Sequence, residues 1–186
     1  RDAFNYGLKM ISYADRLKLS KNKVDIQPPD TTVINLLQSE DEILANMHQK
    51  WRYNIRLSAK KGVEIKKYSK DSPQISQKID KFYELTKITN QRDGNASHSK
   101  SYYFDLITSS FSENQKDIGP FINLYIAEHD GEEIASIMTL FNKTEAIYLY
   151  GASSNSKRNL MPNHLLQWTA ILDTKKYNYQ IYDIYE

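Results

Sequence analysis

Side chains able to carry positive charge recur at every fourth residue between positions 48 and 60, where the sequence has His48, Arg52, Arg56 and Lys60. Residues four apart lie on the same face of an α-helix, so this spacing predicts a cationic ridge along one helix. A guanidinium can grip a phosphate or carboxylate through two parallel hydrogen bonds, and Tyr53 adds a hydroxyl beside the two arginines. Arg52, Tyr53 and Arg56 are therefore predicted to hold an anion; the alternative is that they contact only water.

The helix that would carry this ridge has recognisable end signals. Ser39 and Glu42 are spaced as a capping box, and Gly62 suits the position just after a helix end. Like charges four residues apart weaken a helix by about 0.2–0.5 kcal/mol per pair, so helix stability does not explain the ridge. We expect one continuous helix over residues 41–61, with a second, apolar face formed by Leu44, Met47, Trp51 and Ile55.

A second set of polar residues lies further along the chain. Arg92 follows a predicted helix, where it can either bind an acidic ligand or cap the helix carbonyls. Tyr148 and Tyr150 are two residues apart in a predicted strand, so they are expected to share one face and to line a cleft. Lys157 and Arg158 lie in the loop after that strand and either contact RNA phosphates or form a solvated basic loop.

Residues for catalysis are sparse. The chain has no cysteine, which excludes disulfides and thiolate chemistry, and its four histidines lack the spacing of metal ligands. No Ser-His-Asp set is evident, so the candidates for a general base are the carboxylates Asp105, Glu133 and Asp183. No metal site and no cofactor are expected. The formal net charge of +2 implies that any binding of nucleic acid is local.

The elements that must position these residues are clearest in the second half of the chain. Three apolar runs separated by turn residues predict an antiparallel meander, at 121–127, 134–141 and 146–152. The other expected elements are helices at 72–91, 102–111 and from 162 onward, and strands at 31–36, 63–68 and 180–185. This order predicts an α/β (α+β) fold of the acetyltransferase-like type, in which helices flank a mixed sheet containing the meander.

Several segments resemble one protein family. Residues 50–63 read KWRYNIRLSAKKGV, which is similar to the segment K-x-R-Y-N-I-R-x-A-x-K-x-G-V of the Fem family, the aminoacyl-tRNA-dependent transferases that build peptidoglycan cross-bridges. Further matches follow in the family's order, and the resemblance runs from about Asp25 to the end. They are TNQRDG at 89–94, YLYGASS at 148–154, PNHLLQW at 162–168 and YD at 182–183.

The resemblance implies transfer of glycine, alanine or serine from aminoacyl-tRNA to an amine on the stem peptide of a peptidoglycan precursor. The implied partners are aminoacyl-tRNA and UDP-MurNAc-pentapeptide or its lipid-linked form. The implied location is the cytoplasm, with peripheral contact to the inner membrane if the acceptor is lipid-linked. Because an aminoacyl ester is already activated, alignment and oxyanion stabilisation would supply most of the rate. The residues implied in binding acceptor or tRNA are Arg52, Tyr53, Arg56, Arg92, Tyr148, Tyr150, Lys157 and Arg158.

The family's organisation implies two subdomains. Residues 1–29 are expected to be the remnant of a first acetyltransferase-like subdomain and a linker, and residues 30–186 a second one that is truncated at its C-terminal end. The chain would then be a fragment that lacks the family's lysine-bearing segment beyond the last strand. That last strand is expected at an unprotected sheet edge.

Two other functions remain open. A CoA-dependent N-acyltransferase would use the same fold, but residues 154–160 lack the glycines whose backbone N–H groups hold a pyrophosphate. A non-catalytic basic RNA-binding module would rest on the cationic ridge alone. In such a module Arg52→Lys and Arg56→Lys keep the affinity, whereas a bidentate acceptor site loses function on both changes.

Overall fold

The structure is a computed structural model that describes residues 31–184, so the predicted remnant at residues 1–29 lies outside the described residues. In chain order the elements are β1 (Val33–Asn35), α3 (Glu40–Asn46), α4 (Gln49–Lys60), β2 (Glu64–Tyr68), α5 (Ile75–Asp93), α6 (Lys100–Thr108), the 3-10 helix η1 (Glu113–Gln115), β3 (Phe121–His129), β4 (Glu132–Asn142), β5 (Glu145–Ser153), the 3-10 helix η2 (Arg158–Leu160), α7 (Pro162–Lys176) and β6 (Ile181–Asp183).

The strands form a six-stranded sheet in the order β1-β6-β5-β4-β3-β2. β5 and β6 run parallel, and every other neighbouring pair is antiparallel. The predicted meander is confirmed as β3, β4 and β5. At its first turn Asp130 and Gly131 both have positive φ, 54° and 76°, as a tight two-residue hairpin requires. The expected α/β fold with a mixed sheet is confirmed.

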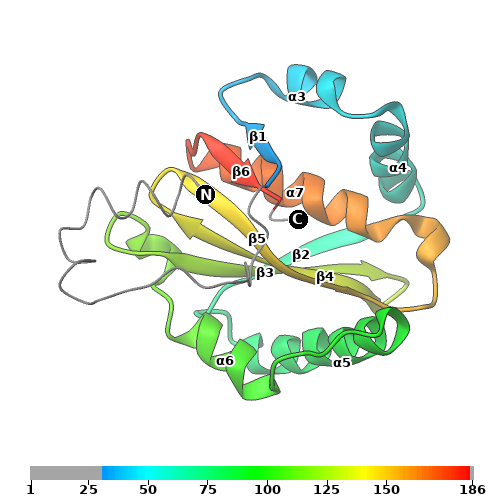
Figure 1. Ribbon diagram of the computed structural model, residues 1–186, viewed down its shortest axis with the longest axis vertical. Helices are drawn as coiled ribbons and strands as arrows, with labels where there is room; N and C mark the ends of the chain where they lie inside the picture. Colours follow the sequence, from blue (N-terminus) through cyan, green and yellow to red (C-terminus); the bar gives the residue numbers. More distant parts are fainter. Residues whose placement is uncertain (1–30, 185–186) are drawn as a thin grey trace, which may run out of the picture.

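Helices cover both faces of the sheet. Figure 1 shows α3, α4 and α7 over one face and α5 and α6 over the other. The central strand β3 explains why both faces need cover, because its first seven residues are all buried. Its side chains alternate between two cores: Phe121, Tyr125 and Ala127 pack on the α7 side, and Ile122, Leu124 and Ile126 on the α5 side.

The last strand does not lie at a sheet edge, contrary to the sequence-based expectation. β6 is enclosed between β5 and β1, and Ile34 in β1 pairs with Tyr182 in β6. The β-branched run that includes Val33 forms β1, which pairs with β6 in antiparallel orientation. Tyr182 is fully buried in consequence.

The single helix predicted over residues 41–61 is in fact two helices. Its outer ends are as predicted, since Ser39 and Glu42 form the capping box and Gly62 has a φ of 80°. The chain becomes extended at Met47 and His48, whose ψ angles are 149° and 140°. The prediction of one continuous helix was wrong because the apolar residues keep helical spacing across Met47 and His48, and neither of these residues is a helix breaker.

Candidate functional site

A cleft opens where the sheet splits between its two parallel strands. β5 has nine residues but β6 has three, and β6 pairs only with residues 145–147 of β5. From Tyr148 to Ser153, the side of β5 away from β4 has no strand neighbour among residues 31–184. A cavity of about 320 Å³ occupies the opening, and we call it the split-sheet cleft. Its lining includes Trp51 from α4, Arg92 from α5 and His164 from α7.

One side chain replaces the missing strand at the end of β5. The Thr89 hydroxyl accepts a hydrogen bond from the Ser153 N–H (2.9 Å) and donates one to the Ser153 carbonyl (3.1 Å). Backbone groups at a sheet edge need partners when they are buried, and Ser153 is 8% exposed. Thr89 therefore joins the last turns of α5 to the edge of the cleft.

Arg92 lies one turn beyond Thr89 and reaches the same edge. Its Nε and Nη2 donate to the two carboxylate oxygens of Asp93, at 2.8 and 3.2 Å, and this bond lowers the pKa of Asp93. Its Nη1 points to the Asn155 Oδ1 (3.2 Å) and, at 3.5 Å, to the carbonyl and hydroxyl of Ser153. Arg92 thus reaches across to the strand and does not cap its own helix, which was the alternative to ligand binding.

The guanidinium of Arg92 stands between two cavities. The second, of about 190 Å³, also has Ser153 and His164 in its lining and extends toward Ser156 and Arg158 of the following loop. The two cavities therefore share Arg92 and His164 as common walls. An elongated acidic ligand could contact one guanidinium from both sides.

His164 was not among the site residues predicted from the sequence, but the structure places it in the cleft wall. Its Nε2 lies 3.1 Å from the Nδ2 of the buried Asn54, and its ring packs edge-on against Trp51 at 4.6 Å between centroids. Burial lowers the pKa of His164 below its ordinary value, and the nearby charge of Lys50 acts in the same direction. The signal that could have found it is its position in the first turn of the helix that follows the loop.

Tyr148 and Tyr150 lie on opposite faces of the sheet, contrary to the expectation that they share one. Thr139 pairs with Tyr148 and Met138 with Tyr150, so Leu149 is an extra residue in a β-bulge. Tyr148 packs toward α7 and lines the split-sheet cleft. Tyr150 packs toward α5 and lines a separate cavity of about 330 Å³, where its hydroxyl lies 2.9 Å from that of Tyr102.

The predicted anion-binding residues of α4 have different environments. The Arg52 Nη1 donates to three backbone carbonyls at the end of α3, those of Leu44 (3.2 Å), Ala45 (2.9 Å) and Met47 (2.7 Å). Tyr53 is 61% exposed, and Arg56 is exposed with no hydrogen bond or ion pair to any residue in the described range. Arg52 therefore has a structural role, while Tyr53 and Arg56 face solvent.

The two loop cations also differ. Lys157 forms an ion pair with Glu132 (2.9 Å) and donates to the His129 carbonyl (3.2 Å), which joins the loop to the β3–β4 turn. Arg158 is exposed in η2, borders the second cavity and adds to the field that lowers the pKa of Asp93.

The three candidate bases lie outside the lining of the split-sheet cleft. Asp105 is exposed on α6, on the other side of the sheet. Glu133 forms an ion pair with Lys78 at 2.5 Å, in which both side chains are mostly buried. Asp183, in β6, accepts a hydrogen bond from the Thr31 hydroxyl. Within the described part of the chain, no three His, Asp or Glu side chains are grouped to hold a metal ion.

A comparison with protein-family models shows to which family this chain belongs. The family model described as the FemAB family matches residues 10–118 and 108–185. The chain belongs to the FemAB family. The resemblance seen in the sequence motifs is thereby confirmed, and its segments in α4, α5, β5 and α7 contribute residues to the lining of the split-sheet cleft.

Individual relatives of this FemAB family member are distant. A lipid II:glycine glycyltransferase of Staphylococcus haemolyticus is 22% identical over an alignment 216 positions long, which covers 85% of this chain and 50% of the relative. One of Staphylococcus aureus is 22% identical over 237 residues, with 95% and 55% covered. The chain therefore spans about half the length of these relatives.

Solved structures of similar fold include a crystal structure of FemX, with a TM-score of 0.75, 20% identity and coverage of 88% of this chain and 54% of that one. The C-terminal domain of a putative lysylphosphatidylglycerol synthetase from Agrobacterium fabrum has a TM-score of 0.60 and 12% identity, with 83% and 45% covered. Both show a shared fold. No helix in residues 31–184 combines the length and apolarity needed to cross a membrane.

Proposed function

We propose that the protein containing this chain transfers glycine, alanine or serine from aminoacyl-tRNA to an amine on the stem peptide of a peptidoglycan precursor. The observation that carries the proposal is the position of Arg92 between two cavities at the split of the sheet, in a member of the FemAB family. Relatives named lipid II:glycine glycyltransferase support a lipid-linked precursor as acceptor, and UDP-MurNAc-pentapeptide is the soluble counterpart.

Arg92 suits an acceptor that carries phosphates and carboxylates. Asp93 holds two of its nitrogens and fixes the plane of the guanidinium, while Nη1 has only long contacts of 3.2–3.5 Å to Ser153 and Asn155. An anion entering either cavity would replace these contacts with charge-assisted hydrogen bonds. In this proposal Tyr148 lines the acceptor's path within the cleft, and Tyr150 lines the separate cavity on the α5 side.

The transfer itself needs alignment more than strong acid–base groups. The acceptor amine attacks the ester carbonyl, the new peptide bond forms, and the 3′ end of the RNA leaves as an alcohol. In an antiparallel pair of strands, every second residue of a strand directs its N–H and its C=O toward the same side of that strand. Since those of Ser153 point to Thr89, the N–H of Gly151 points toward the opening, and we place the developing oxyanion there. Among residues 31–184, the carboxylate that lines the cleft is that of Asp93, which accepts two hydrogen bonds from Arg92.

Charged tRNA places this reaction in the cytoplasm, at the inner membrane face when the acceptor is lipid-linked. The test incubates the full-length protein with radiolabelled aminoacyl-tRNAs and either precursor, with and without ribonuclease. We expect ribonuclease-sensitive label on the precursor and loss of transfer in Arg92→Gln. Arg92→Lys should also lose most of the transfer, because a lysine ammonium cannot make the two parallel hydrogen bonds of a guanidinium. Absence of label with both precursors would reject the transferase, and saturable thermal stabilisation by CoA would favour an acyltransferase.

A further inference from the structure

The cations on the outer face of α4 differ from most others in the structure because they are not neutralised. Lysines elsewhere on the described surface are commonly ion-paired, including Lys66, Lys67, Lys78, Lys81, Lys100, Lys157 and Lys176. By contrast, no ion pair or side-chain hydrogen bond to a residue within 31–184 is formed by Lys50, Arg56, Lys60 or Lys61. α4 also contains no acidic residue.

Helix stability accounts for only part of this uncompensated charge. Lys60 and Lys61 at the C-terminal end complement the helix dipole, but Lys50 lies in the first turn, where a cation is unfavourable. Arg56 is four residues from both Arg52 and Lys60, a spacing that destabilises a helix. Of the two arginines, Arg52 contributes to the fold through its contacts to the end of α3, whereas Arg56 has no such contact in residues 31–184. The remaining charges point to an anionic partner.

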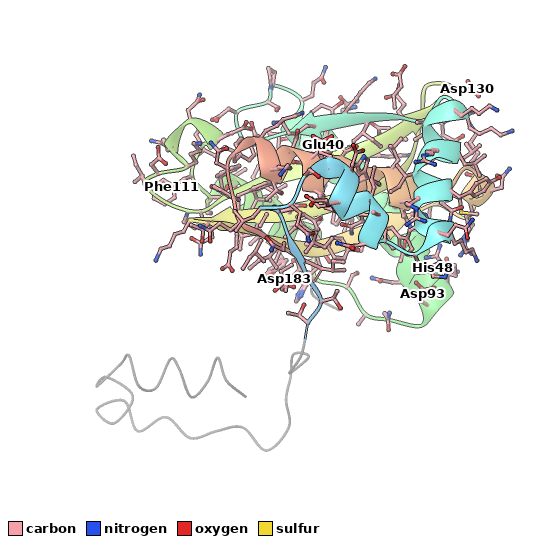
Figure 2. All side chains as sticks on the ribbon, turned by 90° about the horizontal axis from the view of Figure 1, so that it is seen from above. Glu40, His48, Asp93, Phe111, Asp130 and Asp183 are labelled. Atoms are coloured by element: carbon pink, nitrogen blue, oxygen red, sulfur yellow. The ribbon has the colours of Figure 1, made fainter. Side chains whose placement is uncertain are left out.

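The shape of the surface suits an extended polyanion. Lys50 and Lys60 are ten residues apart, which is about 15 Å along a helix, with Arg56 and the exposed Tyr53 between them. The same helix begins at the split-sheet cleft, since Trp51 lines the cavity and contacts His164. Figure 2 shows His48, just before α4, and Asp93, next to Arg92, toward the same end of the molecule and Phe111 at the opposite end.

We propose that the outer face of α4, formed by Lys50, Tyr53, Arg56 and Lys60, is a docking surface for the backbone of an RNA whose 3′ end enters the split-sheet cleft. This inference rests on the proposed function and assigns the body of the donor tRNA to a defined surface. Phosphates of a nucleic acid bind lysine and arginine at such spacings, and a tyrosine hydroxyl donates to a phosphate oxygen.

A lipid surface fits α4 less well. A helix that lies in a membrane interface buries an apolar face among the acyl chains. The inner side of α4, with Asn54, Ile55 and Ser58, is buried and packs against α7, so it is not available. Between Lys50 and Lys60 the outer face offers Tyr53 and Ala59 but no exposed Leu, Ile or Phe. Trp51 is 38% exposed, but it lies toward the cleft, where it contacts His164.

The test measures binding of uncharged tRNA to the full-length protein by fluorescence anisotropy over a range of salt concentrations. In Arg56→Glu/Lys60→Glu we expect at least a tenfold loss of affinity near 0.1 M salt and a salt slope smaller by about 1.5–2, the value for two lost phosphate contacts. The matched control is Lys87→Glu/Lys143→Glu, two exposed cations on α5 and in the β4–β5 turn, which changes the net charge equally. The control is expected to bind nearly as the wild type does.

Other measurements separate this inference from the proposed function. Arg92→Gln should abolish transfer but keep most of the tRNA affinity, since the α4 face holds the body of the RNA. Arg56→Lys should also keep most of the affinity, because a phosphate contact needs mainly charge. Equal tRNA affinity in the α4 variant and its control would overturn the docking surface, whatever the transfer assay shows. If the α4 variant instead loses binding only to phosphatidylglycerol vesicles, the surface contacts a membrane and the RNA inference is wrong.

Discussion

The Tyr148 hydroxyl occupies the space that a Cβ atom on Gly151 would fill. The two residues are three apart on β5, and the bulge at Leu149 lets the ring of Tyr148 fold back over Gly151. The absence of a side chain at position 151 therefore allows Tyr148 to lie along the wall of the split-sheet cleft. Both residues line that cavity.

We expect Gly151→Ala to displace the Tyr148 ring from the cleft wall and to raise the KM for the precursor severalfold. The change in stability should be small, because an aromatic side chain at an open edge can adopt another rotamer. The KM is measured in the transfer assay with full-length protein.

The control for this prediction is a double-mutant cycle with Tyr148→Ala. If the alanine acts through the ring, Gly151→Ala should have little further effect once the ring is gone. Equal effects of Gly151→Ala in both backgrounds would show that it acts on the strand itself.

Thr89→Val should weaken the edge of the cleft and, through it, the placement of Arg92. Valine keeps the shape but leaves the N–H and carbonyl of Ser153 without the partner they now have, at a cost of about 1–3 kcal/mol. We expect a lower free energy of unfolding in urea and a raised KM for the precursor. Thr89→Ser keeps the hydroxyl and should restore both, whereas a KM unchanged in the valine variant would contradict the positioning role.

Arg52→Met should destabilise the protein through the connection between α3 and α4. The carbonyls of Leu44, Ala45 and Met47 lose a charged donor, which corresponds to about 1–3 kcal/mol. Chemical denaturation measures the loss, and Arg56→Met on the exposed face serves as the matched control. Equal stability of the two variants would return Arg52 to its predicted role as an anion ligand.

Stability should depend on pH through His164. Because burial lowers its pKa in the folded state below the ordinary value of 6.5, the unfolded chain binds a proton at a pH where the folded chain does not. Its contribution is therefore present in full above about pH 6.5 and is lost as the pH falls toward the folded pKa. Urea titrations at pH 7.5 and 5.5 should show a smaller loss on acidification in His164→Gln. The same loss in the variant and the wild type would assign the dependence to other groups.

Local signals made much of the fold predictable. The meander follows from apolar runs separated by turn residues such as Asp130 and Gly131, whose preference for positive φ decides the hairpin without help from distant contacts. Arg92 was predicted as a site residue because a helix end and a family motif coincide there. The family itself was recognisable from motifs along α4, β5 and α7, and the comparison confirmed it.

The sequence-based predictions were wrong where a tertiary contact determines the local structure. The break at Met47 and His48 is held by Arg52, which reaches back to carbonyls that a sequence pattern cannot place. Likewise, one extra residue in β5 places Tyr148 and Tyr150 on opposite faces of the sheet, and a β-bulge has no periodic signal in the sequence. The role of His164 in the cleft wall depends on Asn54, 110 positions earlier in the chain.

Among residues 31–184, the cleft opens where β5 continues past the three residues that pair with β6. The opening is therefore bounded by a stretch of β5 without a second neighbouring strand in the described range, and not by a gap among the packed side chains of a core. Apart from Thr89, whose hydroxyl holds the backbone of Ser153, few residues around the opening replace a strand neighbour, so substitutions at the other lining positions can change the ligand at little cost to the fold.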